Sequence, residues 1–504
     1  MKFIIILILF QLFISDSQAQ KEDYVWIFGF DNSPPIGNNE TYYFDFNQGS
    51  SPKGMAGLSP LWIRGNNASI CDAEGHLLFY TNGCHVADAN HDIMPNGSGI
   101  NEGEFIEEFR QDTCINYPGL QDLLFLNDPG NNDGYYLIHK RIRNESNFPR
   151  ELNYSYIDKT LNGGLGDISD KNQTIADSID FMYNYLTAIH HANGVDWWLL
   201  QLSQDEKIYF YLINNAGIEL SHVEIIDTEF VINSSGSGTA KFSPDGEKYA
   251  FFNPYNNLFL YDFDREFGDL DNLQTLEILN TPNNVPRFSS IEWSPNSRFL
   301  YIASEDVLYQ IDTWEDNLED GLVLIDTWNG VQDPFNTTFV LMASAPDCKI
   351  YMCSGSGTFS YHVINKPNEK GVACDFVQQG IRLPFVSATA TMPNFPRFRV
   401  DEEDKCNDAI TSIFGDQVFY RRDMHVYPNP VRDILNIEIP EGHRGRIVVI
   451  DMMGQLVWSG DSDRYSGEVQ IDLSLLAVGT YSVEFLPNEN RERLVYTAQV
   501  VRVE

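Results

Sequence analysis

The chain has 504 residues, 43% of them hydrophobic and 13% aromatic, which is enough for a large apolar core and for more than one ordinary domain. Its formal net charge of −39 argues against nucleic-acid binding, because no basic cluster is present to neutralise phosphates. Short apolar runs separated by Gly, Pro, Asn and Asp recur throughout and long helical patterns are rare, so we expect an all-β protein.

The start of the chain resembles an export signal. Lys2 precedes an apolar run from Phe3 to Phe10, and a polar stretch then ends at Ala19 and Gln20. A basic start, a short apolar core and a small residue at the end predict a signal peptide over residues 1–19, cleaved between Ala19 and Gln20. The apolar run is shorter than the ~20 residues that a membrane span needs. No later run is long enough either, so we expect no transmembrane segment in the mature chain.

A turn motif recurs in the middle of the chain. Ser243-Pro244-Asp245-Gly246 is followed after 51 residues by Ser294-Pro295-Asn296-Ser297, and after another 51 by Ala345-Pro346-Asp347-Cys348. Proline fixes φ, Asp bonds its own backbone and Gly accepts a positive φ, so each copy predicts a tight hairpin. With three weaker upstream copies, the glycine position of the turn falls at Gly75, Gly134, Gly194, Gly246, Ser297 and Cys348.

Hairpins repeating every 51–60 residues predict a β-propeller over residues 20–400. The length of this region indicates about seven blades, with six or eight as alternatives, and unrelated β-sandwich hairpins are the competing interpretation. The first strand, residues 24–29, could pair into the final blade and so close the ring. The turn residues Gly75, Gly134, Gly194, Pro244, Asp245, Gly246, Pro295, Pro346 and Asp347 are expected to have structural roles.

Seven cysteines are present, at positions 71, 84, 114, 348, 353, 374 and 406. An odd number leaves at least one thiol free or intermolecular, and the pairing is otherwise open. Cys348 and Cys353 lie five positions apart on one expected strand, so they point to opposite faces and should not pair. Cys348 also occupies the glycine position of its turn, which favours a local structural role.

Several segments carry a resemblance to known propellers. Residues 68–83, which include Ala68-Ser69-Ile70-Cys71-Asp72, look like the opening of a propeller family common in secreted proteins of Bacteroidetes. Residues 186–194, 258–264 and 363–368 add to the resemblance, and the Ser-Pro-Asp-Gly turns resemble those of TolB-like and WD-repeat propellers. The resemblance implies a fold and a lineage. It implies no activity and no catalytic residue.

The C-terminal part reads as a separate module. An acidic linker is expected over residues 401–425, and short strands separated by turns over 426–504 predict a small Ig-like β-sandwich. This module closely resembles the type A C-terminal sorting domain of type IX secretion. The motif residues are Tyr427, Pro428, Asn429, Pro430, Asp451, Gly454, Gln455, Gly479 and Tyr481. The resemblance implies the type IX translocon and sortase as partners, and passage through the periplasm to the outer-membrane surface or the medium.

The sequence shows no nucleophile elbow, His-Glu-x-x-His helix or other catalytic motif, so we predict neither catalytic residues nor a cofactor. His190, His191 and Asp196 are weak metal candidates. The carboxylates of residues 128–133 and 262–271 could suit calcium, although neither run has the spacing of a known calcium loop. The favoured function is a non-catalytic binding or scaffold protein for an unknown glycan or protein ligand. A secreted hydrolase acting on polysaccharide is the alternative.

Overall fold

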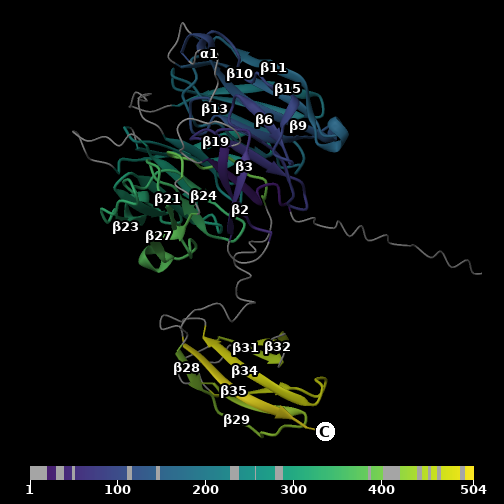
Figure 1. Cartoon of the computed structure of the whole chain (residues 1–504). Coiled ribbons are helices and arrows are strands. Elements are labelled where there is room, and N and C mark those ends of the chain that lie inside the picture. The colour runs from purple at the N-terminus through teal and green to yellow at the C-terminus, as the bar shows by residue number, and fades with distance from the viewer. Residues whose placement is uncertain are drawn as a thin grey trace, which may run out of the picture. The chain divides into compact units, whose positions relative to one another are not determined.

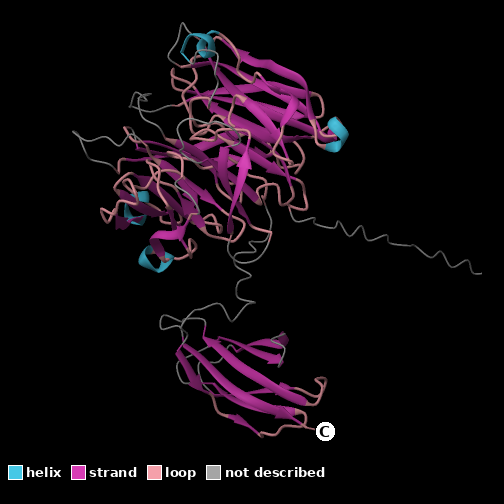
Figure 2. Cartoon of the chain, viewed as in Figure 1, coloured by secondary structure: helices cyan, strands magenta, loops and turns pink. Residues whose placement is uncertain are grey.

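The structure is a computed structural model and describes residues 20–29, 39–47, 52–109, 116–143, 148–226, 238–255, 257–278, 288–383, 387–400, 420–439, 445–451, 456–462, 467–487 and 494–503. The expected signal peptide 1–19, with Ala19, and the motif residues Gly454 and Gln455 lie outside the described residues. The chain divides into two compact units, residues 1–408 and 409–504. The described residues are mainly strands, with a few short helices (Figure 2).

The first unit is a β-propeller. Its described residues form seven antiparallel sheets that follow one another along the chain, six with four strands and one with three (Figure 1). We number these sheets blades 1 to 7 in chain order. The expectation of about seven blades is therefore confirmed.

Blade 1 is the three-stranded sheet of β1 (Val25–Gly29), β2 (Asn39–Asp45) and β3 (Lys53–Ser59). Blade 2 contains β4 (Ala68–Cys71), β5 (Leu77–Thr81), β6 (His85–Asp88) and β7 (Ile93–Ser98). Blade 3 contains β8 (Leu123–Asp128), β9 (Asn131–Ile142), β10 (Pro149–Asp158) and β11 (Asp167–Asp177). Blade 4 contains β12 (Thr187–His190), β13 (Trp197–Leu202), β14 (Lys207–Asn214) and β15 (Gly217–Ile225).

Blade 5 contains β16 (Thr239–Phe242), β17 (Lys248–Asn253), β18 (Asn257–Asp264) and β19 (Asp269–Leu276). Blade 6 contains β20 (Ser290–Trp293), β21 (Phe299–Ser304), β22 (Val307–Asp312) and β23 (Leu322–Thr327). Blade 7 contains β24 (Met342–Ser344), β25 (Ile350–Met352), β26 (Ser360–Ile364) and β27 (Phe376–Arg382). Short helices are α1 (Glu104–Phe109), α2 (Leu318–Gly321) and the 3-10 turns Asn162–Gly164 and Gly371–Cys374.

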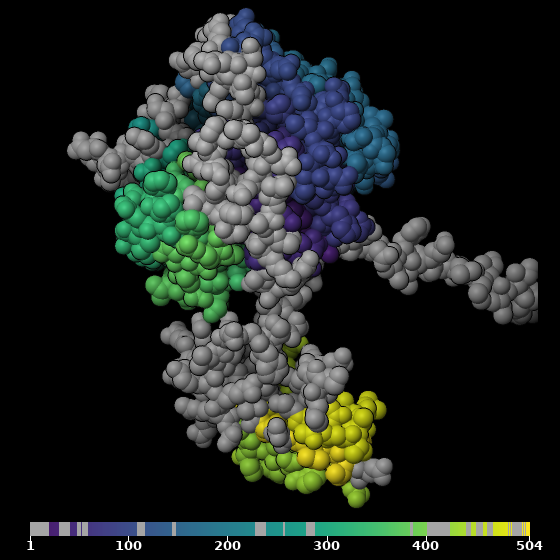
Figure 3. All heavy atoms as spheres, in the orientation of Figure 1, coloured from purple at the N-terminus to yellow at the C-terminus, as the bar shows by residue number. Residues whose placement is uncertain are grey.

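The first strands of successive blades lie next to each other, as β1 and β4, β4 and β8, and the series β12, β16, β20 and β24 show, so we place the first strand of each blade innermost. Apolar side chains fill the space between adjacent blades around the whole ring, including that between blades 7 and 1. Figure 3 shows the early blades in purple and blue and the late blades in green as parts of one packed body. Each blade hides its faces only against its neighbours, so the ring must close to bury the first and last sheets.

Ring closure uses aromatic packing rather than strand pairing. β1 pairs with β2 of its own sheet, so the expectation that the early strand joins the final blade is not met. The ring of Trp26 instead lies 6.1 Å from that of Tyr351, and the ring of Phe28 lies 5.5 Å from that of Tyr361, both edge-on. Such pairs stabilise by about 0.5–1.5 kcal/mol beyond the area they bury.

Five of the six expected turn positions join the first and second strands of a blade. Each of these five residues has a positive φ, from 59° to 91°; they are Gly75, Gly194, Gly246, Ser297 and Cys348.

Gly134 is the exception. It lies inside β9, paired with Asp158, and the turn of blade 3 comes earlier, between Asp128 and Asn131. Glycine is needed there for close approach, because a Cβ would lie 1.9 Å from the Tyr156 hydroxyl oxygen. The assignment of Gly134 as a turn residue was therefore wrong, although its structural role is real.

The cysteines within the described residues divide into two groups. Cys71, Cys353 and Cys374 are free and buried, whereas Cys84 and Cys348 each belong to a disulfide. Cys114 and Cys406 lie outside the described residues. The expectation of at least one free thiol is confirmed, and Cys353 does not pair with Cys348. No helix in the described ranges has the length and apolar character needed to cross a membrane.

The second unit has two sheets. The larger has the order β28-β35-β34-β31-β32 and the smaller β29-β30-β33. Their bounds are β28 (Tyr420–Asp423), β29 (Val426–Tyr427), β30 (Ile434–Ile439), β31 (Gly445–Asp451), β32 (Leu456–Ser462), β33 (Gly467–Asp472), β34 (Gly479–Pro487) and β35 (Leu494–Arg502). One apolar core joins the two sheets, with Leu435 and Ile471 from the smaller and Val483 and Val500 from the larger. β28 pairs in parallel with β35, so the C-terminal end of the expected linker 401–425 belongs to this unit.

Candidate ligand site at the propeller axis

Residues 388–399, which we name the axial segment, cross the inner strands of the ring. The backbone N–H of Ala388 donates to the carbonyl of Gly29 in blade 1 (2.9 Å), and that of Ala390 donates to Ser354 in blade 7 (3.0 Å). The segment therefore touches the first and last blades at its own beginning. It lies past β27, the last strand of the seventh blade.

Asn394 continues the axial segment across blades 2, 3 and 4. Its backbone N–H donates to the carbonyl of Asn67 (3.1 Å), and its side-chain amide donates to the carbonyls of Leu123 and Leu186 (3.1 Å each). These carbonyls lie at or beside the starts of inner strands. Buried backbone groups must be paired, and this one side-chain amide pairs with a backbone carbonyl of blade 3 and with one of blade 4.

Arg397 extends the segment to blades 4, 5 and 6. Its backbone N–H donates to the Ala188 carbonyl (2.8 Å), and its Nη2 donates to the Phe242 carbonyl (2.9 Å) and to Glu292 (3.3 Å). Arg399 then returns to blade 1 by an ion pair with Asp23. The axial segment thus contacts all seven blades and occupies the axis of the ring.

A pocket of about 450 Å³ opens beside the C-terminal half of the axial segment. The turns that follow the inner strands of blades 5, 6 and 7 line it, through Pro244, Pro295 and Pro346 among others. Aromatic and charged side chains complete the lining; they are Asp23, Tyr24, Lys241, Phe242, Asp245, Glu292, Trp314, Phe395, Arg397, Phe398 and Arg399. The repeated turns, which the sequence indicated only as structural, therefore also shape the pocket.

A charged triad forms the deep wall of the pocket. The carboxylate of Glu292, only 2% exposed, lies 3.5 Å from Lys241 Nζ and 3.3 Å from Arg397 Nη2. Burial lowers the pKa of Lys241, against the attraction of Glu292, and the neighbouring Arg397 lowers it further. The Glu292 carboxylate accepts a hydrogen bond from Arg397, so it acts as an acceptor in this wall.

Trp314 provides an aromatic surface at the pocket, with 65% of the residue exposed. The Arg298 guanidinium lies 5.0 Å from its ring centroid and binds both carboxylate oxygens of Asp312 (2.9 and 2.7 Å). These hydrogen bonds lower the pKa of Asp312 to about 2. Because Asp312 anchors Arg298 in this way, the guanidinium holds the indole of Trp314 in place through a cation–π contact.

The turns that line the pocket are linked to each other. The backbone N–H of Asp245 in blade 5 donates to Ser297 Oγ in blade 6 (2.9 Å), and that of Asn296 donates to Asn368 Oδ1 in blade 7 (3.0 Å). Ser297 therefore replaces glycine at a positive φ while its hydroxyl joins two blades. In blade 7, the Tyr351 hydroxyl donates to Asp347 (2.7 Å), and burial raises the pKa of that carboxyl.

The weak metal candidates His190, His191 and Asp196 take other partners in the structure. His190 stacks on Trp197 with 3.6 Å between ring centroids, and His191 Nε2 lies 3.0 Å from the Glu266 carbonyl. Asp196 instead accepts from the Asn193 side chain (2.7 Å). Among the described residues, one group of three possible metal ligands gathers, and it consists of His222, Glu224 and Asp269. Asp269 was part of the carboxylate run 262–271, whereas the other two were missed.

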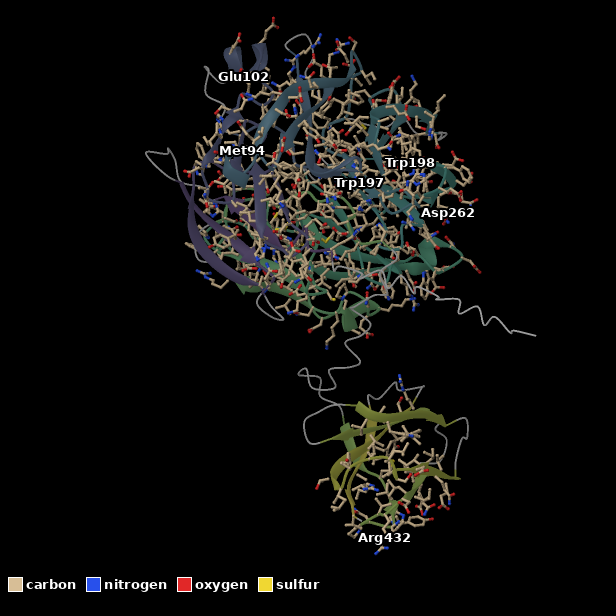
Figure 4. The ribbon with its side chains drawn as sticks, turned by 90° about the vertical axis from the view of Figure 1, so that its right-hand side faces the viewer. Met94, Glu102, Trp197, Trp198, Asp262 and Arg432 are labelled. Atoms are coloured by element: carbon tan, nitrogen blue, oxygen red, sulfur yellow. The ribbon has the colours of Figure 1, made fainter. Side chains whose placement is uncertain are left out.

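The sorting motif residues lie in the second unit. The bonds Tyr427-Pro428 and Asn429-Pro430 are cis, and the Asn429 side chain accepts from the backbone N–H of Val501 (3.0 Å). The Tyr481 hydroxyl donates to the carbonyl of Ala477 (2.7 Å). Gly479 begins β34 and Asp451 ends β31. Figure 4 shows side chains of both units.

Comparison with known proteins finds one family that matches part of the chain and several solved structures that are similar to it. Residues 425–496 match the family described as the secretion system C-terminal sorting domain. No curated protein matches the chain.

Three solved structures are similar to this chain, all at low identity. A Lactobacillus plantarum protein is 12% identical, with 72% of this chain and 98% of that chain covered and a TM-score of 0.44. The periplasmic gluconolactonase of Pseudomonas aeruginosa is 10% identical, with 72% and 98% covered and a TM-score of 0.40. The β-propeller domain of Cps50 (Swd1) from Myceliophteria thermophila is 11% identical, with 63% and 88% covered and a TM-score of 0.37.

The sorting-domain match and the two-sheet module cover the same part of the chain. The chain therefore ends in the C-terminal sorting domain of the type IX secretion system, which implies secretion or attachment at the outer-membrane surface.

Proposed function

We propose that this protein is a non-catalytic glycan-binding protein, secreted or held at the cell surface, and that the pocket beside the axial segment holds the ligand. The observation that carries this proposal is the position of the exposed Trp314 at a pocket with charged donors in its wall. At about 450 Å³ the pocket falls within the ~300–1,000 Å³ range of small-ligand sites.

The chemistry of the wall suits a saccharide. A sugar ring can lay its C–H face on the indole of Trp314, since aromatic faces provide large apolar area with a fixed geometry. The ammonium of Lys241 and the guanidinium of Arg397 are donors, and Glu292 is an acceptor, so hydroxyl groups would find both kinds of partner.

The ion pairs of the same wall bear on the alternative function, which is hydrolysis. A glycosidase needs a carboxyl group that stays protonated to act as the general acid, which a raised pKa provides. Glu292 lies between two cations, and both oxygens of Asp23 accept from Arg399. Both carboxylates already accept hydrogen bonds within ion pairs, so we assign them to structure and binding rather than to proton transfer.

The test is a glycan array followed by calorimetry with the full chain. We expect Trp314→Ala to weaken binding of the captured glycan about two- to twelvefold, which corresponds to the ~0.5–1.5 kcal/mol of an aromatic contact. Phe335→Ala is the matched control, because Phe335 is 58% exposed and does not line the pocket. Equal affinity of the Trp314 variant and the unchanged protein would show that the glycan does not bind at this pocket. Release of new reducing ends from the glycans would show that the protein is a hydrolase.

A further inference from the structure

A second cluster of polar side chains lies away from the pocket, between the outermost strands of blades 4 and 5. His222 and Glu224 are two positions apart on β15, so they point to the same face of the strand. Asp269 is the first residue of β19. One ligand atom from each of these three residues lies within 4.8 Å of the others.

The ring of His222 is held in one orientation. It stacks on Phe210 with 4.3 Å between centroids and 13° between planes, and it meets Trp198 edge-on at 6.3 Å. Trp198 itself reaches across to blade 5, where its Nε1 donates to the Arg265 carbonyl (2.9 Å). Figure 4 labels Trp198 of β13 and Asp262 of β18, which belong to the two blades that flank this cluster.

The two nitrogens of His222 have different surroundings. Nδ1 lies 3.0 Å from Ser221 Oγ, to which it can donate. Nε2 is buried and has no hydrogen-bond partner, and it lies 3.6 Å from Glu224 Oε1. The carboxylate is positioned in turn, because Glu224 Oε1 accepts from the backbone N–H of Leu270 on β19 (3.1 Å).

Ser221 Oγ and His222 Nδ1 can form their hydrogen bond with either atom as the donor. In the tautomer with the proton on Nδ1, the Nε2 lone pair faces the carboxylate of Glu224, and Asp269 adds a second negative group, so that three acceptors lie against one another. Acceptors that face each other without a donor are unfavourable, particularly where one of them is buried. A histidine that donates through one nitrogen and directs the other at carboxylates is the usual arrangement of a metal ligand with its supporting hydrogen bond.

We propose that His222, Glu224 and Asp269 bind a divalent transition metal of the zinc class and thereby join blades 4 and 5. Zinc takes imidazole nitrogen and carboxylate oxygen at about 2.0–2.2 Å, so tetrahedral ligands lie roughly 3.3–3.6 Å apart. The 3.6 Å from Nε2 to Oε1 fits this spacing. Asp269, which is exposed, is the third protein ligand and comes from blade 5, and water is the fourth ligand. Calcium is disfavoured, because it takes oxygen ligands and more of them.

The test uses the full chain after removal of metals by chelator and dialysis, titrated with ZnCl₂ by calorimetry. We expect one site per chain, and a rise of about 2–5 °C in the propeller melting temperature at saturation. Cobalt substitution should give the visible absorption of a tetrahedral ion. Millimolar CaCl₂ should leave the melting temperature unchanged.

Variants distinguish this site from adventitious binding. His222→Gln and Asp269→Asn should each weaken zinc binding at least tenfold, and Asp269→Asn is expected to fold because the side chain is exposed. Asp271→Asn is the matched control on the same strand and should bind zinc normally. The competing arrangement is a protonated His222 paired with Glu224 alone. Zinc binding that is absent, or that is unchanged in Asp269→Asn, would overturn the proposal.

Discussion

The guanidinium of Arg399 binds both carboxylate oxygens of Asp23, at 2.5 and 2.6 Å, and so joins residues 376 positions apart in the chain. Asp23 lies two residues before β1, the first strand of blade 1, and Arg399 is the last residue of the axial segment that follows blade 7. The side chain of Asp23 is 8% exposed, so water screens the pair little. The ion pair therefore fastens the two ends of the propeller to each other.

We predict that Arg399→Met destabilises the propeller by about 2–3 kcal/mol, because a nearly buried carboxylate loses its charged partner. The Arg382–Asp333 pair is the control, since its side chains are 65% and 28% exposed. Arg382→Met should cost at most ~1 kcal/mol, as exposed pairs do. Chemical denaturation of the propeller transition measures both changes. Equal losses in the two variants would show that Arg399 acts as an ordinary surface residue.

We predict that Gly246→Ala destabilises the propeller by about 1–2 kcal/mol without changing ligand affinity. Its φ of 74° disfavours any L side chain, and an added Cβ would also lie 2.6 Å from Arg265 Cδ and 3.0 Å from Val400 Cγ1. Gly194→Ala is the matched control, because its φ of 72° is similar and nothing lies within 4 Å. The difference between the losses in melting temperature of the two variants then measures the steric effect of Arg265 and Val400 on the added Cβ. A weaker ligand affinity in a Gly246→Ala protein of normal stability would contradict this assignment.

The sequence predicted the ring well because its evidence is local. Pro244 and Gly246 determine a turn through their own backbone preferences, and the same preferences recur in the other copies. Gly134 shows the limit of this reasoning, because glycine there makes room for the Tyr156 hydroxyl rather than for a turn. Tight turns and close approaches select the same residue.

The sites could not be predicted in the same way. The Asn394 side chain donates a hydrogen bond to the backbone carbonyl of Leu123, 271 positions away. Because every residue has such a carbonyl, the sequence cannot indicate which one is bound. Arg397 and Glu292 are likewise brought together only by ring closure. His222 and Glu224 have the spacing of residues on one strand face, a signal that could have been noted, but Asp269 joins them through tertiary structure alone.

We predict that the propeller loses stability steadily as the pH falls below about 6.5. His139 is buried between Asn101 Oδ1 (2.7 Å) and Ser155 Oγ (3.0 Å), and burial lowers its pKa to about 3. Between pH 6.5 and 3 the unfolded chain therefore binds a proton that the folded chain does not, so acid favours unfolding. Burial likewise lowers the pKa values of His190 and His362 to about 4.

The measurement is the free energy of unfolding in urea at pH 7.5, 6.0 and 5.0. Each of these histidines should contribute about 1.4 kcal/mol of lost stability per pH unit below 6.5. His139→Gln should reduce the slope by about 1.4 kcal/mol per pH unit, whatever its effect on stability at pH 7.5. His76→Gln is the control, because that side chain is 77% exposed. A slope that is unchanged in His139→Gln would mean that His139 is already charged in the folded protein.

We predict that the C-terminal unit directs export and that the propeller folds and binds without it. The apolar core of residues 424–500 is complete within the second unit, and the axial segment closes the ring before residue 400. A chain that ends at Asp408, the last residue of the first unit, should therefore keep the melting temperature of the propeller and its ligand affinity. In the native host it should accumulate in the periplasm, because residues 425–496 carry the sorting signal. Cell fractionation and a melting curve give the two readouts. Normal amounts of the shortened protein at the surface or in the medium would refute the role in sorting, and a lowered melting temperature would make the C-terminal unit a structural part of the ring.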